Sequence, residues 1–212
     1  AAFFFGKPLV GGVWAADKKP TEAQVERVAV GLEEAGGFPA ELAAAALRYS
    51  SSSVTYDPAY YKIPYPGGDV PANKGVAADL LLRCFRKLGI DLQKEIHEDI
   101  SRHFPLYPQL WAATAPDANI DHRRVPNLQR FFSRKGETLP VSSDPAGYLP
   151  GDIVVWALAN AETHIGIVVP AAPSDGGAGH PWVVHHPAGG RVKWEKALFD
   201  HQILGHFRYS GE

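Results

Sequence analysis

Apolar residues recur at helical spacing over the first two-thirds of the chain and in short β-like runs over the last third. The first expected helix begins at Thr21, whose N-cap side chain forms a capping box with Gln24. Gly36-Gly37 end this helix. A second helix is expected from Phe38-Pro39 to about Tyr49. Together the two form a helical hairpin that carries no obvious chemistry.

The same periodicity predicts three further helices. Their expected ranges are Val76 to Leu88 with Gly89 as the stop, Asp91 to a break at Pro105, and Arg124 to Lys135 with Gly136 as the stop. Before them, residues 56–68 are dense in proline and glycine and predict an ordered loop.

After Pro150-Gly151-Asp152 the pattern changes to β-branched and aromatic runs separated by turn residues. The expected strands are Ile153 to Trp156, His164 to Val169, Trp182 to His186 and His206 to Tyr209. Helices followed by an antiparallel sheet predict an α+β fold. We expect one compact unit in which an N-terminal arm and hairpin, residues 1–55, pack on a body formed by residues 56–212.

Two stretches near the start of the chain, Ala2 to Phe5 and Leu9 to Trp14, are largely apolar and allow two interpretations. They resemble the tail of a signal segment ending near Ala15-Ala16. However, Lys7 and Pro8 interrupt the apolar stretch, and we favour an arm docked on the body.

Composition argues against a nucleic-acid-binding protein and against a membrane-spanning segment. In 212 residues there are 21 Lys plus Arg against 23 Asp plus Glu, so there is no basic field of the kind that nucleic-acid binders carry. The sequence has no apolar run near the roughly 20 residues that span a bilayer. Its one cysteine, Cys84, rules out an internal disulfide and sits inside an apolar helix, which predicts a buried and unreactive thiol.

Three segments of the sequence together have the pattern expected of one nucleophile site. The helix that opens at Gly75 would present free N–H groups and positive charge at position 77, which stabilise a thiolate and an oxyanion. His164 opens one strand and is followed by the small Gly166, and His185 lies on the next strand. A nucleophile needs a base, and the base needs an orienting group. Two strand histidines are also compatible with a purely structural role.

Five motifs in chain order resemble those of NlpC-type cell-wall peptidases, papain-like bacterial enzymes that cut peptidoglycan stem peptides. The motifs are Tyr65-Pro66-Gly67-Gly68, Gly75-Val76-Ala77, Pro150-Gly151-Asp152-Ile153-Val154, Thr163-His164-Ile165-Gly166-Ile167-Val168 and Val184-His185. Residues 56–93 and 119–128 are similar to an uncharacterised branch of that superfamily found in bacterial envelopes. The resemblance covers roughly Tyr56 to Tyr209 and implies a papain-like fold in a periplasmic or secreted protein.

The resemblance also implies roles for particular residues. Position 77 would hold a cysteine nucleophile, His164 would be the base, and His185 would orient it, with His186 as the alternative orienter. Tyr65 would line the oxyanion region, and Asp79 would be a favourable charge at the helix end. Substrate contacts are expected from Asp121, His122 and Arg123, for which a surface ion-pair cluster is the alternative, and from Trp156. The resemblance implies no cofactor and no metal.

This chain departs from the pattern at Ala77, because a methyl group cannot attack a carbonyl. Two explanations remain open: an engineered Cys→Ala change, which we favour because both histidines are kept, and a naturally inactive homologue. The corresponding functions are a murein stem-peptide hydrolase shown in an inactive form, and a pseudoenzyme that binds cell-wall peptide or a partner protein. An inhibitor or immunity protein is a possible partner.

A zinc-dependent hydrolase is a third hypothesis, because three neutral imidazoles could hold zinc with an open position. The candidate histidines are His164, His180, His185 and His186. No HExxH or comparable spacing supports this hypothesis.

Overall fold

The computed structural model describes residues 20–175 and 179–211 and has the predicted α+β architecture. In the described residues the α-helices are α1 (Glu22–Ala35), α2 (Phe38–Ser50), α3 (Ala77–Lys87), α4 (Leu92–His103) and α5 (Val125–Lys135). Short 3-10 turns are η1 (Phe104–Leu106), η2 (Asp121–Arg123), η3 (Pro145–Gly147) and η4 (Pro173–Asp175). The expected helices are confirmed, including the capping box of Thr21 and Gln24.

A six-stranded antiparallel sheet follows the helices, with the strand order β3-β8-β4-β5-β6-β7. Its strands are β3 (Glu137–Thr138), β4 (Ile153–Ala157), β5 (Thr163–Val169), β6 (Trp182–His185), β7 (Lys193–Glu195) and β8 (Gln202–Arg208). A separate parallel pair joins β1 (Thr55–Tyr56) to β2 (Lys74–Gly75).

The sheet differs from the prediction at its edges. Its two outer strands, β3 and β7, were not expected, because two or three residues are too few to show an alternating pattern. The last strand, β8, begins at Gln202, before the expected start at His206, and β6 ends at His185, so His186 lies just beyond it.

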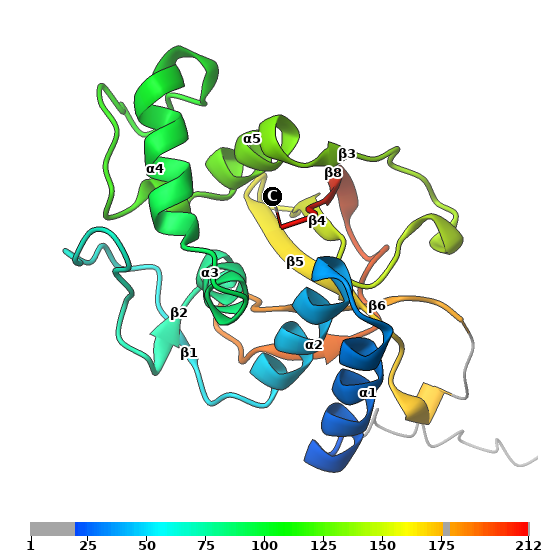
Figure 1. Cartoon of the computed structure of the whole chain (residues 1–212). Coiled ribbons are helices and arrows are strands. Elements are labelled where there is room, and N and C mark those ends of the chain that lie inside the picture. Colours follow the sequence, from blue (N-terminus) through cyan, green and yellow to red (C-terminus); the bar gives the residue numbers. More distant parts are fainter. Residues whose placement is uncertain (1–19, 176–178, 212) are drawn as a thin grey trace, which may run out of the picture.

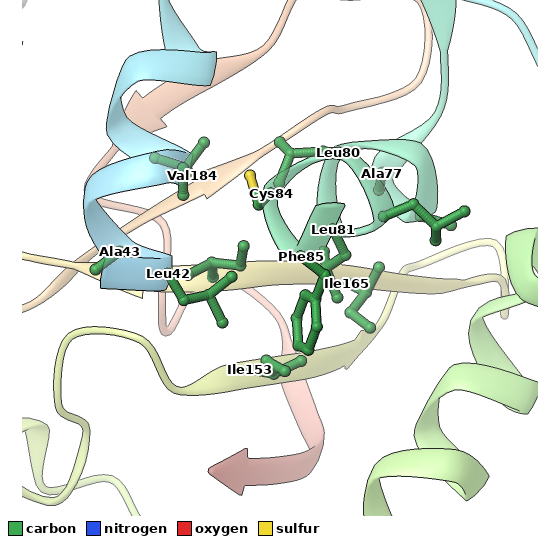
Figure 2. Close-up of a cluster of buried hydrophobic side chains, with 14 of the residues drawn as sticks. Leu42, Ala43, Ala77, Leu80, Leu81, Cys84, Phe85, Ile153, Ile165 and Val184 are labelled. Atoms are coloured by element: carbon green, nitrogen blue, oxygen red, sulfur yellow. The ribbon is translucent and has the colours of Figure 1, made fainter. Parts of the chain in front are cut away.

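Helices α2, α3 and α5 cover one face of the sheet (Figure 1). The apolar side chains of β4 and β5 that point toward them, such as Ile153 and Ile165, meet Leu42 of α2 and Phe85 of α3 (Figure 2). Burying one such side chain contributes roughly 1.5–3 kcal/mol. Ala77, at the start of α3, lies at the border of this cluster (Figure 2). The core therefore fixes where α3 begins relative to β5.

The opposite face of the sheet is covered as well. Val154, Trp156 and Val168 form a second buried cluster with Tyr148 and Leu198. The indole N–H of Trp156 donates to the carbonyl oxygen of Leu198 at 2.8 Å, which satisfies its one polar group. Because side chains alternate along a strand, His164 shares this face with its cross-strand partner Trp156.

The expected N-terminal hairpin packs into the main core, since Leu42 and Leu47 of α2 are fully buried in the cluster that α3 and the sheet complete. The arm that the sequence predicts before Pro20 lies outside the described residues. In the part of the chain that the structure describes, no helix combines the length and the apolar character needed to span a membrane.

Candidate functional site

Helix α3 begins with an open N-terminus at Ala77. Val76 precedes it as the N-cap residue, in extended conformation with φ of −125°, and a valine side chain has no acceptor atom for the first-turn N–H groups. Such groups, together with the helix dipole, favour an anion at this end of the helix. Ala77 is nearly buried, at 5% exposure, so a slightly larger side chain here would project into the neighbouring cavity.

A buried ion pair holds this helix end in place. The Asp79 carboxylate accepts the backbone N–H of Val76 at 2.7 Å and two N–H groups of Arg123, at 2.8 and 3.0 Å. Arg123 also donates to the carbonyl oxygens of Ala59 and Asp57. The Asp79 and Arg123 side chains are 1% and 2% exposed. Their donors and acceptors are therefore directed at the protein itself, where they tie the start of α3 to the loop after β1.

The two predicted histidines are hydrogen-bonded to each other. His164 Nε2 lies 2.9 Å from His185 Nδ1, and His185 Nε2 lies 2.8 Å from Glu195 Oε1. The three side chains come from β5, β6 and β7, which are neighbours in the sheet. We call this series the His-His-Glu relay.

The relay determines which nitrogen of His164 is free. A carboxylate only accepts hydrogen bonds, so Glu195 receives the proton on Nε2 of His185. The Nδ1 atom of a neutral His185 is then an acceptor, and His164 must donate to it through Nε2. Nδ1 of His164 is consequently unprotonated in the neutral relay, and it is the atom that could act as a base.

Burial keeps His164 neutral. Burial is the main cause that lowers the pKa of His164 from 6.5 to about 3, and the neighbouring His185 lowers it further. At the other end of the relay, the hydrogen bond from His185 is the main cause that lowers the pKa of Glu195, and Lys193 adds to it. The relay therefore has a neutral imidazole at its inner end and a carboxylate at its outer end at neutral pH.

Gly166 makes room for the relay. The register places His185 opposite Gly166, and His164 opposite Trp156, so the two histidines meet diagonally across the sheet. A Cβ atom on Gly166 would lie 2.9 Å from the carbonyl oxygen of Val184 and 3.1 Å from both His185 Cβ and Trp156 Cη2. A side chain at this position would thus displace His185 or the indole that packs beside both histidines.

Ala77 and His164 line the same cavity, which has a volume of about 430 Å³. The cavity is also lined by Tyr56, Trp111, Arg124 and Glu162. A second cavity of about 360 Å³ is lined by the two relay histidines together with residues of the β4–β5 and β6–β7 connections. Tyr56, Glu162, Thr163 and His164 border both cavities. His164 thus lies between the two cavities, and the start of α3 lines the first of them.

Two of the expected site residues lie elsewhere. Tyr65 is not among the residues that line either cavity, and its exposed ring instead packs edge-on against His97 of α4, with centroids 4.8 Å apart. Tyr56, which the sequence did not single out as a site residue, lines both cavities. Trp156 is buried and lines neither cavity, but its ring backs His164 at a centroid distance of 5.8 Å. Trp156 therefore packs behind the His164 ring and does not face either cavity.

The remaining candidates are buried. His186, the alternative orienter, points away from the relay: its Nε2 lies 3.2 Å from the Gly190 carbonyl oxygen, and its ring packs edge-on against Tyr56. Asp121 accepts the backbone N–H of Asp117, and His122 is buried, which lowers its pKa to about 3. Neither Asp121 nor His122 lines the cavities described above.

Sequence reasoning missed Glu195 and Tyr56. Glu195 follows Lys193 and Trp194 in a three-residue strand, too short for its alternation to be recognised. Tyr56 ends the two-residue strand β1, inside a segment that the proline content marks as loop. Among the described residues no group of three His, Cys, Asp or Glu side chains is placed to hold a metal ion.

The fold and the site together define an α+β protein with a His-His-Glu relay beside the open N-terminus of a buried helix. Comparison with known families places the chain more narrowly: residues 43–209 match the model of the domain of unknown function DUF1287, and the chain belongs to this family. It is also 48% identical, over 160 residues, to the uncharacterized protein YijF of Escherichia coli (strain K12); the match covers 74% of this chain and 75% of YijF. No solved structure matches the chain.

Proposed function

We propose that this site is that of a papain-like cysteine peptidase of the NlpC type, acting on peptidoglycan stem peptides in the bacterial envelope, whose nucleophile is replaced by Ala77. One observation carries the proposal: the relay ends at His164 in the cavity that Ala77 lines at the start of α3. The substrate class and the envelope location come from the resemblance of the sequence motifs.

With a cysteine at position 77, the chemistry follows from the positions of the groups. Nδ1 of His164 takes the thiol proton, and the thiolate attacks the carbonyl carbon of the substrate amide. First-turn N–H groups of α3 stabilise the oxyanion that forms. The C–N bond then breaks, and His164 returns its proton to the leaving amine. Water hydrolyses the thioester, with His164 again accepting a proton, and the acid product and free thiol are released.

His185 and Glu195 are positioning residues in this scheme. They hold the proton of His164 on Nε2 and so leave Nδ1 free, and the nearby carboxylate stabilises the imidazolium that forms during the reaction. Asp79 and Arg123 position the helix end from inside the protein. The chain as it stands has no nucleophile at position 77 and should not cut peptides by this route.

The test is digestion of purified muropeptides by the Ala77→Cys protein, analysed by mass spectrometry beside the parent chain. We expect cleavage by Ala77→Cys alone, with product masses that name the bond. Two matched variants control for the site. Ala188→Cys places a thiol in the second cavity, away from α3, and the double variant Ala77→Cys/His164→Ala keeps the nucleophile without its base. Both should be inactive. Absence of cleavage by a folded Ala77→Cys protein would contradict the peptidase proposal.

Ala77 itself favours a second candidate function, a protein that binds cell-wall peptide or a partner without cutting it. In that case the cavity only binds its ligand, and the Ala77→Cys protein should bind cell-wall peptide without forming cleavage products. A zinc-dependent hydrolase has no such observation in its favour within residues 20–175 and 179–211.

A further inference from the structure

The connection between η1 and α5 contributes an aromatic and cationic wall to the cavity of Ala77 and His164. Trp111 and Arg124 both belong to this wall. Among the exposed large hydrophobic residues in the described part of the chain, Trp111 has the greatest exposure, 62%, although it borders a cavity. An exposed tryptophan beside a hollow is a common arrangement at ligand sites.

The backbone at this rim is held in an unusual conformation. The non-glycine residues with positive φ in the described chain are Trp111 at 56°, Ala112 at 55° and Ala161 at 63°. Trp111 and Ala161 line the cavity, and Ala112 is next in sequence. Residues with a Cβ atom enter this region at a cost of the order of 1 kcal/mol, and such residues cluster at binding sites. The strained rim fixes where the indole stands.

The Arg124 guanidinium is oriented by two neighbours. It lies over the Trp111 ring, 4.8 Å from the ring centroid, and its Nη1 atom is 3.2 Å from Asp121 Oδ1. A guanidinium has five N–H donors. In the described part of the chain, the Arg124 side chain makes a single hydrogen bond, the one to Asp121. Further N–H donors of the guanidinium therefore remain for a ligand. Arg123 differs, because its donors go to Asp79, Ala59 and Asp57.

Charge is distributed unevenly along the cavity. Arg124 lies in the wall formed by the η1–α5 connection, whereas the exposed carboxylate of Glu162 lies on the rim that the first cavity shares with the second. A ligand carboxylate would be repelled at the shared rim and attracted at Arg124. A planar guanidinium stacked on an aromatic ring is suited to bind a carboxylate through two parallel hydrogen bonds.

We propose that Arg124, stacked on Trp111, binds a free carboxylate of the substrate next to the scissile amide and so determines specificity for acidic peptides. The proposal rests on the proposed function for the substrate class and adds the group that is recognised. It places a substrate contact at Arg124, next to Asp121, His122 and Arg123, which the sequence left open as either substrate contacts or an ion-pair cluster.

Binding to the inert parent chain tests this directly. The probes are the tripeptide L-Ala-γ-D-Glu-diaminopimelate and its counterpart in which the free α-carboxylate of the glutamyl residue is a primary amide. We expect the parent chain to bind the carboxylate form at least tenfold more tightly, by calorimetry. Arg124→Gln should remove this preference, and Arg124→Lys should keep part of it, since a lysine retains charge without the planar fork. The matched control, Arg102→Gln on the exposed surface of α4, should leave the preference unchanged.

Three results would overturn the inference: a preference that persists in Arg124→Gln, an equal loss of affinity for both peptides, or no binding of either peptide to the parent chain. Circular dichroism melting of each variant separates misfolding from lost recognition. Trp111→Phe and Trp111→Ala add a second readout, because the ring should be needed to orient Arg124 and only the alanine variant should lose the preference.

Cleavage separates this inference from the proposed function. If Ala77→Cys cuts both peptides with equal kcat/KM, with or without Arg124, the peptidase stands and the carboxylate site is wrong. If the parent chain shows the Arg124-dependent preference and Ala77→Cys still cuts neither peptide, recognition stands and the peptidase is wrong.

Discussion

The Nε2 atom of His164 lies 2.9 Å from Nδ1 of His185, although the two residues are not cross-strand partners. The register pairs His164 with Trp156 and His185 with Gly166. The two histidine rings therefore meet diagonally, in the space that the missing side chain of Gly166 leaves open. The carboxylate of Glu195 then sets the proton positions in both rings. This one contact decides which nitrogen of His164 is available for chemistry.

The space above Gly166 should be essential for that contact. We expect Gly166→Ala to destabilise the fold by about 1–3 kcal/mol, the usual cost of overpacking, because the new methyl group meets a backbone oxygen, His185 and Trp156. Urea unfolding measures the change. Gly147→Ala is the control, since no atom lies within 4 Å of its added Cβ, and it should alter stability little. Equal stability of the two variants would mean that the sheet relaxes around the methyl group.

The relay should act through the tautomer of His164. In the Ala77→Cys background, His185→Ala should lower kcat/KM by about 10²-fold or more, in the range of general acid–base effects. His185→Gln should recover part of that loss, because an amide oxygen can accept the proton on Nε2 of His164. Glu195→Gln should have a smaller effect, because the Glu195 side chain is partly exposed. Kinetics against pH provide the measurement. A profile and rate unchanged in His185→Ala would remove the relay from the mechanism.

Asp79 and Arg123 should be needed for stability. Removing one partner of a buried ion pair typically costs about 3–5 kcal/mol, so Asp79→Ala should destabilise the protein by that order. The exposed pair Arg102–Glu98 is the comparison, and Arg102→Ala should cost less than about 1 kcal/mol. Chemical denaturation gives both values. If Asp79→Ala left stability unchanged while weakening peptide binding, Asp79 would be a ligand contact rather than a residue that holds the helix end.

Burial of His164 predicts a pH dependence with a definite sign. The folded pKa, about 3, lies below the unfolded value near 6.5, so between these values the unfolded chain binds a proton that the folded chain does not. Stability should therefore fall as pH decreases from 6.5 toward 3, by at most about 1.4 kcal/mol per pH unit from this group. His164→Gln should reduce that slope. Imidazole nitrogen shifts in NMR titrations should show no His164 midpoint near pH 6.5.

The sequence predicted the helices well because their ends are marked by capping or stop residues. Thr21 and Gln24 form a capping box, Asp91 is an N-cap, and Gly36 and Gly136 are stops, all of which act within a few residues. The short edge strands β3 and β7 carried no such signal. They exist because longer neighbours offer open edges for pairing, which is a tertiary effect.

The candidate site was predictable where it depended on order along the chain. The motifs predicted Ala77, His164 and His185 as site residues, and the structure brings these three residues to one region. Tyr56, Glu195 and the orientation of Arg124 depend on pairing and packing between distant segments. The distinction between Arg123 and Arg124 likewise could not be read from two adjacent arginines, because only the fold shows which one is enclosed.

We propose above all that position 77 is a nucleophile position served by His164, and the pKa of a thiol placed there tests this most directly. Burial raises the pKa of Cys84, so its thiol should not contribute to thiolate absorbance between pH 4 and 9. For Ala77→Cys we predict a thiol pKa well below the ordinary value of about 8.5, lowered by the helix N-terminus and by the imidazolium that forms when the thiol proton moves to His164. It should rise again in Ala77→Cys/His164→Ala. A pKa near 8.5 in both proteins would contradict the account.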